Sequence, residues 1–209
     1  MNFRKSPTVQ TLAVFCVVFA VQSLIGLVAQ GLATQLFVLH APVGNNPLSL
    51  VLSVYAHGSV GHLFSNALVL VLVGIPVERT TTKWRYHGFF ATVGIAAGVS
   101  QVVFTSLVTL GTTRPGVLGA SGAVFGLFGY LLASNVVADT LLERLPLGAR
   151  GQLVVLFVLA MGVTLLTASP GVALVAHFTG FVLGALAGRV HLLRTRAETQ
   201  PSNKWERYG

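Results

Sequence analysis

The feature that most constrains this chain is a set of long stretches that contain no charged residue. No Asp, Glu, Lys or Arg lies between Lys5 and Glu78, and further uncharged stretches cover residues 86–113 and 151–188. Charged residues make up 9% of the chain, whereas an ordinary soluble domain has about 25%. Uncharged apolar runs of about 17–25 residues are typical of membrane spans. The chain is therefore expected to reside in a lipid bilayer.

Six apolar segments are expected to cross that bilayer as helices, because their length and their lack of period-two alternation disfavour strands. They are residues 11–32, 60–77, 89–110, 121–138, 153–168 and 172–190. The first is longer than the apolar part of a secretory signal, so we expect it to be retained. The predicted fold is an all-α membrane protein with a six-helix bundle over residues 9–193. Residues 1–8 form a short cytoplasmic N-terminus, and residues 194–209 form a basic cytoplasmic tail.

The positions of the charges predict the orientation of the bundle. With a cytoplasmic N-terminus, twelve of the thirteen Lys and Arg residues fall on the cytoplasmic side, and Arg114 alone falls outside. This asymmetry follows the positive-inside rule. It predicts a multi-pass protein of the cell membrane with both termini in the cytoplasm. It also accounts for the net charge of +8, and since no aromatic-rich basic patch accompanies that charge, no nucleic-acid partner is expected.

All five acidic residues fall on the cytoplasmic side in the same arrangement. They are Glu78, Asp139, Glu143, Glu198 and Glu206. No carboxylate is then available within the membrane, which excludes a Ser-His-Asp triad, a carboxylate proton relay and a carboxylate metal site. Cys16 is the single cysteine, so neither an intramolecular disulfide nor a thiolate metal site is expected. We expect no metal and no cofactor.

Four polar residues within the predicted spans are candidate functional residues, because such groups are costly inside a bilayer. They are His62, Asn66, Ser121 and His177. All four lie in the first turns of spans that run from outside to inside, so they share a depth in the outer part of the membrane. His62 and Asn66 are four residues apart and share a helix face.

Glycine stripes are expected to bring the serine and the second histidine together. Gly122, Gly126 and Gly129 follow Ser121, and another glycine occurs every third or fourth residue after His177. Small residues at such spacing let membrane helices pack closely. A serine needs a neighbouring base to become a nucleophile, and histidine suits that task near neutral pH. His62, Asn66 and the Ser121 N–H could then stabilise an oxyanion.

Three stretches of the chain resemble the rhomboid family of intramembrane serine proteases. Residues 57–66 (HGSVGHLFSN) resemble its His-rich second span, 119–126 (GASGAVFG) its Gly-x-Ser-Gly motif, and 176–180 (AHFTG) its Ala-His-x-x-Gly motif. Their order and the six-span count also agree. The resemblance covers about residues 45–190.

The resemblance implies a catalytic dyad of Ser121 as nucleophile and His177 as general base. Substrates would be single membrane spans with small residues at the cut. Gly119 and Ala120 join His62 and Asn66 as the residues expected to contact the oxyanion or the substrate. Two supporting residues are expected: Phe125, at the position of the family's stacking tyrosine, and His57. The outer loop, Val43 to Ser53, lacks the family's Trp-Arg pair.

Two other functions remain open. An inactive relative would bind client membrane spans without cutting them. A small transporter or channel would carry inverted repeats and ionisable residues along the whole membrane depth, whereas the polar groups here lie at one level.

Overall fold

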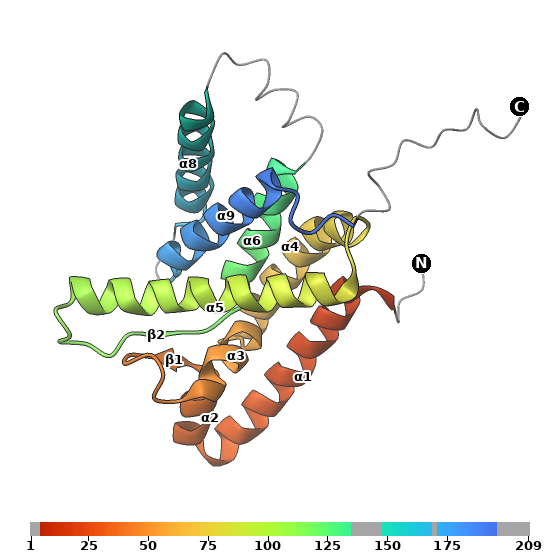
Figure 1. Cartoon of the computed structure of the whole chain (residues 1–209). Helices are drawn as coiled ribbons and strands as arrows, with labels where there is room; N and C mark the ends of the chain where they lie inside the picture. The colour runs from red at the N-terminus through yellow and green to blue at the C-terminus, as the bar shows by residue number, and fades with distance from the viewer. Residues whose placement is uncertain (1–4, 135–147, 169–170, 196–209) are drawn as a thin grey trace, which may run out of the picture.

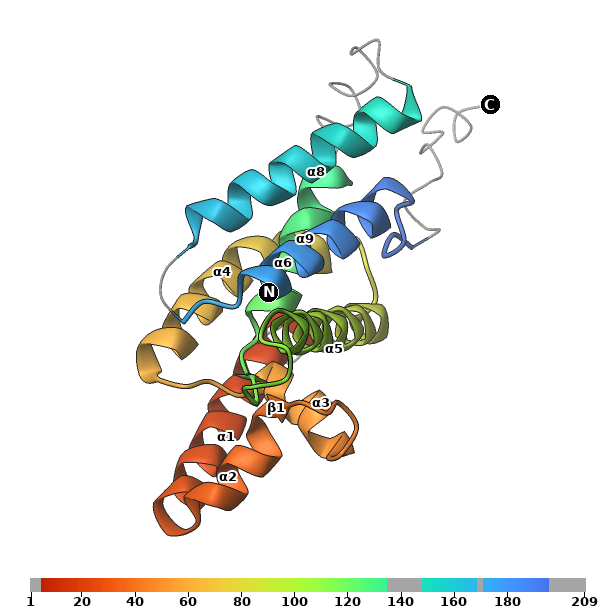
Figure 2. The same ribbon diagram turned by 90° about the vertical axis from the view of Figure 1, so that its left-hand side faces the viewer.

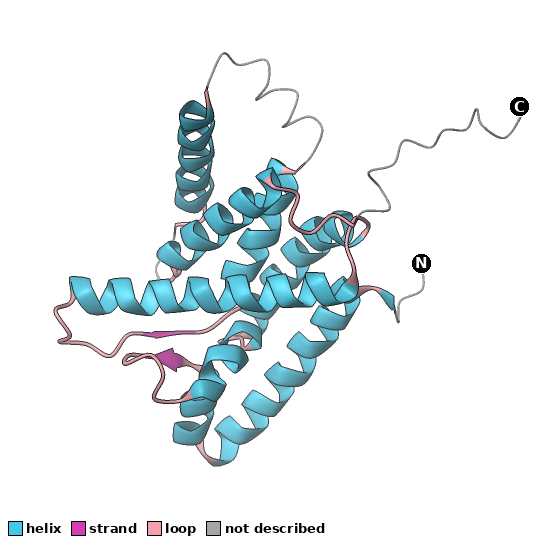
Figure 3. Ribbon diagram, viewed as in Figure 1, coloured by secondary structure: helices cyan, strands magenta, loops and turns pink. Residues whose placement is uncertain are grey.

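The computed structural model of the protein describes residues 5–134, 148–168 and 171–195. Their helices are α1 (Pro7–Val28), α2 (Gln30–Phe37), α3 (Pro47–Tyr55), α4 (Val60–Glu78), α5 (Lys83–Val108), α6 (Ser121–Ala133), α8 (Ala149–Leu166) and α9 (Leu174–Arg189). The strands β1 (Leu39–His40) and β2 (Gly116–Val117) form one short antiparallel pair. Figure 3 shows how little of the described chain is strand. The predicted all-α class is confirmed.

Each predicted span corresponds to an apolar helix. Helices α1, α4 and α5 are long and apolar enough to cross a membrane, and α6, α9 and residues 154–166 of α8 are shorter apolar helices. The end of the fourth predicted span, residues 135–138, lies outside the described residues. The number of crossings and the orientation stay predictions.

Polar side chains determine where four of these helices begin. The capping residues are Ser6, Asn46, Ser59 and Thr82, whose side-chain oxygens accept a hydrogen bond from a backbone N–H two or three residues later. Such a cap typically contributes about 1 kcal/mol to helix stability. The Ser59 cap accepts from the backbone N–H of His62, so it places that histidine in the first turn of α4.

The helices surround α6, which contacts α4, α5 and α9 (Figures 1 and 2). Helix α8 lies at the periphery and packs against α9, while α1 packs on α2 and α4. Glycines allow α6 and α9 to touch along their backbones. A methyl group built on Gly180 or Gly184 would overlap the carbonyl oxygen of Gly122 or Gly126, respectively. The predicted close contact between the two glycine stripes is therefore confirmed.

The segment between α1 and α4 contains more structure than the apolar pattern predicted. The expected first helix, residues 11–32, ends at Val28, and Ala29, whose backbone is not helical (φ −146°, ψ 74°), separates it from α2. This break lets α2 fold back so that Ala33 and Phe37 are buried. The sequence does contain a signal for α3, since Asn46 and Pro47 are favoured cap and first-turn residues.

The ends of several helices are joined at the end of the bundle opposite the start of α6. Glu78 accepts hydrogen bonds from the Ser6 hydroxyl (2.7 Å) and the Thr8 N–H (3.0 Å). Arg85 donates to the carbonyl oxygen of Arg194 at 2.8 Å. The described basic residues in or beside these helix ends are Lys5, Arg79, Lys83, Arg85, Arg189 and Arg194. Arg114, by contrast, follows the opposite end of α5.

Candidate active site

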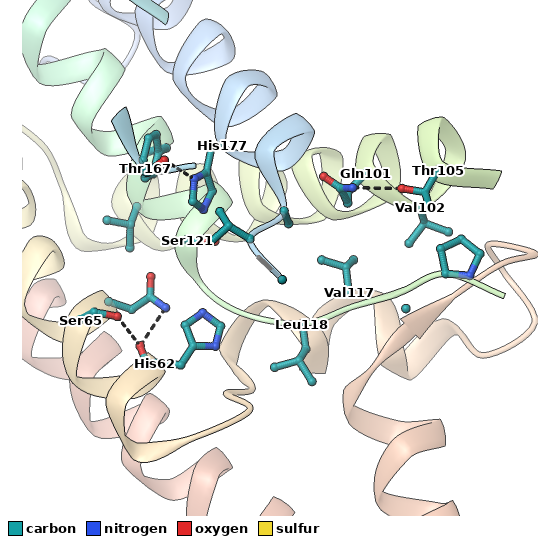
Figure 4. Close-up of a pocket in the computed structure, with 18 of the residues that line it drawn as sticks. His62, Ser65, Gln101, Val102, Thr105, Val117, Leu118, Ser121, Thr167 and His177 are labelled. Carbon is teal, nitrogen blue, oxygen red and sulfur yellow. Dashed lines mark hydrogen bonds between the residues drawn. The ribbon is translucent and has the colours of Figure 1, made fainter. Parts of the chain in front are cut away.

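A cavity of about 860 Å³ collects the polar residues singled out in the sequence. Its lining includes His62, Asn66, Ser121, Phe125 and His177. These side chains come from α4, α6 and α9 (Figure 4). Three helix starts that are far apart in the sequence therefore meet at one place.

The turn before α6 presents Ser121 to this cavity. Gly119 has a φ of +126°, in the region that favours glycine, and its N–H donates to the Ser53 carbonyl at 2.8 Å. Ala120 is fully buried and occupies the N-cap position. Because α6 begins at Ser121, its backbone N–H is among those that an α-helix leaves without an internal partner. Such N–H groups favour negative charge.

His177 lies in the first turn of α9 and is 7% exposed. The Phe125 ring stacks on it, with ring centroids 4.2 Å apart and an interplanar angle of 15°. Its Nδ1 lies 3.1 Å from the hydroxyl oxygen of Thr167. Figure 4 shows Thr167 on one side of the ring and Ser121 on the other. The stacking predicted for Phe125 is present.

Ser121 and His177 lie side by side in the cavity (Figure 4). Among the hydrogen bonds of the described residues, none joins their side chains. In enzymes without bound substrate, such catalytic contacts are often long, and they shorten when the substrate binds. The arrangement thus places the candidate nucleophile and the candidate base as neighbours in one cavity.

A side chain from α5 holds the start of α9. Gln101 accepts hydrogen bonds from the backbone N–H groups of Val175 (3.0 Å) and Ala176 (3.2 Å). Its amide also donates to the Thr105 hydroxyl at 3.0 Å. Sequence reasoning missed Gln101. The signal was a strongly polar amide within the apolar segment 89–110, which was read only as a span.

His62 and Asn66 reach the cavity in different ways. The His62 ring lies over the turn before Ser121, so that a Cβ built on Gly119 would lie 2.6 Å from its Cε1. Asn66 is 6% exposed, and its amide donates to the His62 carbonyl at 3.1 Å. The His62 imidazole thus lies against the turn that precedes Ser121, whereas the Asn66 amide is engaged within its own helix.

His57 lies behind His62 and is not part of the cavity lining. It is fully buried, and its ring meets the His62 ring edge-on with centroids 5.2 Å apart. Its Nδ1 lies 3.1 Å from the Tyr55 carbonyl oxygen, which can only accept a hydrogen bond, so Nδ1 carries the hydrogen. Within the described residues, Nε2 has no hydrogen-bond partner. Burial, followed by the charge of nearby His62, lowers the pKa of His57 to about 4.

The described residues do not contain three His, Cys, Asp or Glu side chains grouped so as to hold a metal ion. The chemistry available in the cavity comes from hydroxyl, imidazole, amide and backbone N–H groups. These groups suit acyl transfer, in which a serine attacks a carbonyl carbon and hydrogen-bond donors stabilise the resulting oxyanion.

Comparisons with known proteins show what the chain is similar to. Residues 45–194 match the family model described as the Rhomboid domain. RHOMBOID-like protein 4 of Arabidopsis thaliana is 33% identical over 142 residues, which are 67% of this chain and 33% of that protein. RHOMBOID-like protein 5 of the same plant is 32% identical over 148 residues, covering 69% of this chain and 44% of that protein. The chain thus spans less than half the length of these two relatives.

A bacterial relative is covered more fully. The rhomboid protein YdcA of Bacillus subtilis (strain 168) is 26% identical over 137 residues, which are 66% of this chain and 63% of that protein. The region matched by the family model, residues 45–194, contains Ser121, His177, His62 and Asn66.

Proposed function

The chain belongs to the rhomboid family, and from this premise we propose that it is an intramembrane serine endopeptidase. It cleaves transmembrane segments of other membrane proteins through a dyad of Ser121 and His177. The observation that carries this proposal is the cavity that Ser121 and His177 share, with Phe125 stacked on the imidazole.

The reaction follows from the groups in the cavity. The Ser121 hydroxyl attacks the carbonyl carbon of the scissile peptide, and His177 takes the hydroxyl proton. The oxyanion is stabilised by the Ser121 N–H and His62, with Asn66 as a further donor once its amide turns from its own helix. His177 then gives its proton to the leaving amine, which breaks the peptide bond. A water molecule, deprotonated by His177, hydrolyses the acyl-enzyme.

The topology of the proposal follows from the charges. Helices α1, α4, α5, α6, α8 and α9 each cross the cell membrane, with both termini in the cytoplasm. The membrane domain covers residues 9–193, followed by a basic tail. Support comes from the basic residues gathered at the end of the bundle opposite Ser121, because cytoplasmic segments carry an excess of Lys and Arg. The cavity then lies in the outer half of the bilayer, where it meets single-span substrates.

The test uses purified protein, a serine-directed fluorophosphonate probe and a reporter with one membrane span. We expect wild-type protein to react with the probe and to cut the reporter, and Ser121→Ala to do neither. The matched control is Ser106→Ala, which removes a hydroxyl that donates only to its own helix, at Val102. Labelling that persists in Ser121→Ala would contradict the assignment. Folded wild-type protein that binds the span but neither reacts nor cuts would be an inactive member of the family.

A further inference from the structure

Thr167 contacts the edge of the His177 ring and lies directly after α8, at its C-cap. Its hydroxyl oxygen lies 2.8 Å from the Thr164 carbonyl oxygen and 3.1 Å from His177 Nδ1. Figure 4 shows the contact to the ring as a dashed line, with Ser121 on the other side of the imidazole. The histidine is therefore held between a hydroxyl and the candidate nucleophile.

The number of hydrogens available determines which group donates in each of these two hydrogen bonds. A hydroxyl has one hydrogen to donate, and a carbonyl oxygen can only accept. The shorter contact, to Thr164, therefore uses the Thr167 hydrogen. The Thr167 oxygen is then left as an acceptor, and its partner at 3.1 Å is an Nδ1–H. A neutral imidazole carries one N–H, so the other ring nitrogen, Nε2, keeps its lone pair.

We propose that Thr167 is a positioning residue that selects this tautomer of His177 and aims the bare Nε2 at Ser121. The proposal rests on the proposed function, in which His177 is the base. A serine protease triad uses an acid to orient the base and fix its tautomer. Here a threonine hydroxyl that is anchored on a backbone carbonyl does the same without a charge.

The alternative tautomer would be unproductive. If the Thr167 hydroxyl turned to donate to Nδ1, the proton would lie on Nε2 and His177 could not accept one from Ser121. The Thr164 carbonyl would still accept the Thr167 backbone N–H at 3.1 Å. The acceptor to which the Thr167 hydroxyl donates therefore decides whether His177 can take the proton of Ser121.

Phe125 and Thr167 restrain different motions of the same ring. The Phe125 ring covers one face of the imidazole, which holds the plane of the ring but does not prevent a 180° flip about the Cβ–Cγ bond, since the flipped ring stacks equally well with its nitrogens in other positions. The contact from Thr167 lies at the ring edge, so it opposes that rotation. Loss of the hydroxyl should therefore affect the chemical step without disturbing the packing of α9.

The decisive variants are Thr167→Val, which keeps the shape but removes the hydroxyl, and Thr167→Ser, which keeps the hydroxyl. A typical hydrogen bond contributes about 1 kcal/mol, and one or two kcal/mol correspond to a factor of about 5–30. We expect Thr167→Val to lower kcat and the rate of fluorophosphonate labelling by about 5–30-fold, with little change in KM or Tm. We expect Thr167→Ser to retain most of the activity.

The matched control is Thr92→Val, which removes a hydroxyl whose hydrogen bonds within the described residues go to carbonyls of its own helix, at Gly88 (2.8 Å) and Phe89 (3.2 Å). It should leave kcat unchanged. A Thr167→Val protein with wild-type kcat would overturn the proposal. A Thr167→Ser protein as slow as Thr167→Val would also overturn it, because the methyl group would then be the part that matters.

A second measurement does not depend on activity. Solid-state ¹⁵N NMR of histidine-labelled protein in bilayers distinguishes a protonated ring nitrogen from a bare one, and the His177→Ala spectrum identifies the His177 signals. We expect wild-type protein to carry the proton on Nδ1 and Thr167→Val to show a mixture. Protonation on Nε2 in the wild type would refute the tautomer. If wild-type protein failed to react with the probe, the proposed function would fail while this spectrum still decided the role of Thr167.

Discussion

His57 illustrates how single residues behind the cavity are constrained. Its ring lies edge-on between Phe15, at 4.8 Å, and His62, at 5.2 Å. Its Nδ1 donates to the Tyr55 carbonyl. A second proton on Nε2 would be a buried donor without a partner among the described residues, which is costly. The folded protein therefore keeps His57 neutral.

This neutral state predicts a loss of stability in acid. The pKa of His57 is about 4 in the folded protein, against the ordinary 6.5, so the unfolded chain binds more protons between these values. The contribution of neutral His57 to the free energy of unfolding is therefore complete above pH 6.5 and is lost as the pH falls towards 4. One pKa unit corresponds to 1.36 kcal/mol, which gives roughly 3 kcal/mol in total. We expect Tm to fall across this range in the wild type and to fall less in His57→Asn.

Asparagine is the matched replacement, because its amide nitrogen can still donate to the Tyr55 carbonyl but cannot gain a proton. The measurement is the thermal unfolding of both proteins in the same detergent between pH 7.5 and 4.5. Parallel Tm curves for the two proteins would show that His57 is not the group that titrates.

A second prediction at this scale concerns the proposed oxyanion donors. Loss of one such donor typically costs on the order of 10²–10³ in kcat. We expect His62→Ala and Asn66→Ala each to lower kcat more than they raise KM, since the donor acts mainly on the transition state. The Ser121 N–H remains in both variants. Asn66 is the sharper case, because its amide donates to the His62 carbonyl in this structure. A lower Tm with normal kcat would assign Asn66 to helix packing.

At the scale of whole helices, the contact between α6 and α9 holds the two residues of the proposed dyad in place. Ser121 begins α6 and His177 lies in the first turn of α9, so their separation depends on how closely the two helices pack. Glycines on both helices let backbone touch backbone. Any side chain at this contact separates the helices and the dyad together.

We therefore expect Gly184→Ala to reduce both stability and activity. The added methyl group would overlap the Gly126 carbonyl oxygen, and overpacking of this kind typically costs 1–3 kcal/mol. The control is Gly162→Ala in α8, where a methyl group would meet nothing within 4 Å. Tm and kcat are measured for both variants. If Gly184→Ala had the same Tm and kcat as Gly162→Ala, the α6–α9 contact would be able to relax, contrary to the rigid contact inferred here.

At the scale of the whole molecule, the basic residues at the helix ends, apart from Arg114, lie at the end opposite the cavity. Glu78, Arg85 and Arg194 join helix ends at one side, whereas Ser121 begins its helix at the other. The proposed orientation places the first end in the cytoplasm and the second in the outer half of the bilayer.

Single cysteines test this orientation on a Cys16→Ala background. Ala173 lines the cavity, so Ala173→Cys should react with an impermeant thiol reagent from the outer side only. Trp84 is 75% exposed near the basic end, so Trp84→Cys should react from the cytoplasmic side only. Labelling is followed in intact cells and in inverted vesicles. The reverse pattern would invert the proposed topology.

Local sequence patterns predicted the six apolar helices and singled out the candidate residues, but they did not predict α2 or α3 as separate helices. Uncharged apolar runs such as residues 86–113 indicate membrane spans, and such spans form helices because a bilayer requires backbone groups to be satisfied within each span. Four residues were evident as polar groups in apolar surroundings: His62, Asn66, Ser121 and His177. Glycine spacing predicted the contact between α6 and α9.

Contacts between distant segments could not be predicted from local sequence patterns. Thr167 looked like an ordinary polar residue at a helix end and Gln101 like a tolerated amide in a span. Their importance arises because α8 and α5 bring them to His177 and to the start of α9. The break at Ala29 likewise depends on α2 burying Phe37 against the rest of the bundle.

By itself, the sequence determined that the chain forms apolar helices and which residues could do chemistry, since burial in lipid acts on each segment separately. Only the tertiary structure decided which side chains lie against His177, because a hydrogen bond needs two atoms about 3 Å apart, and that distance is a property of the packed helices.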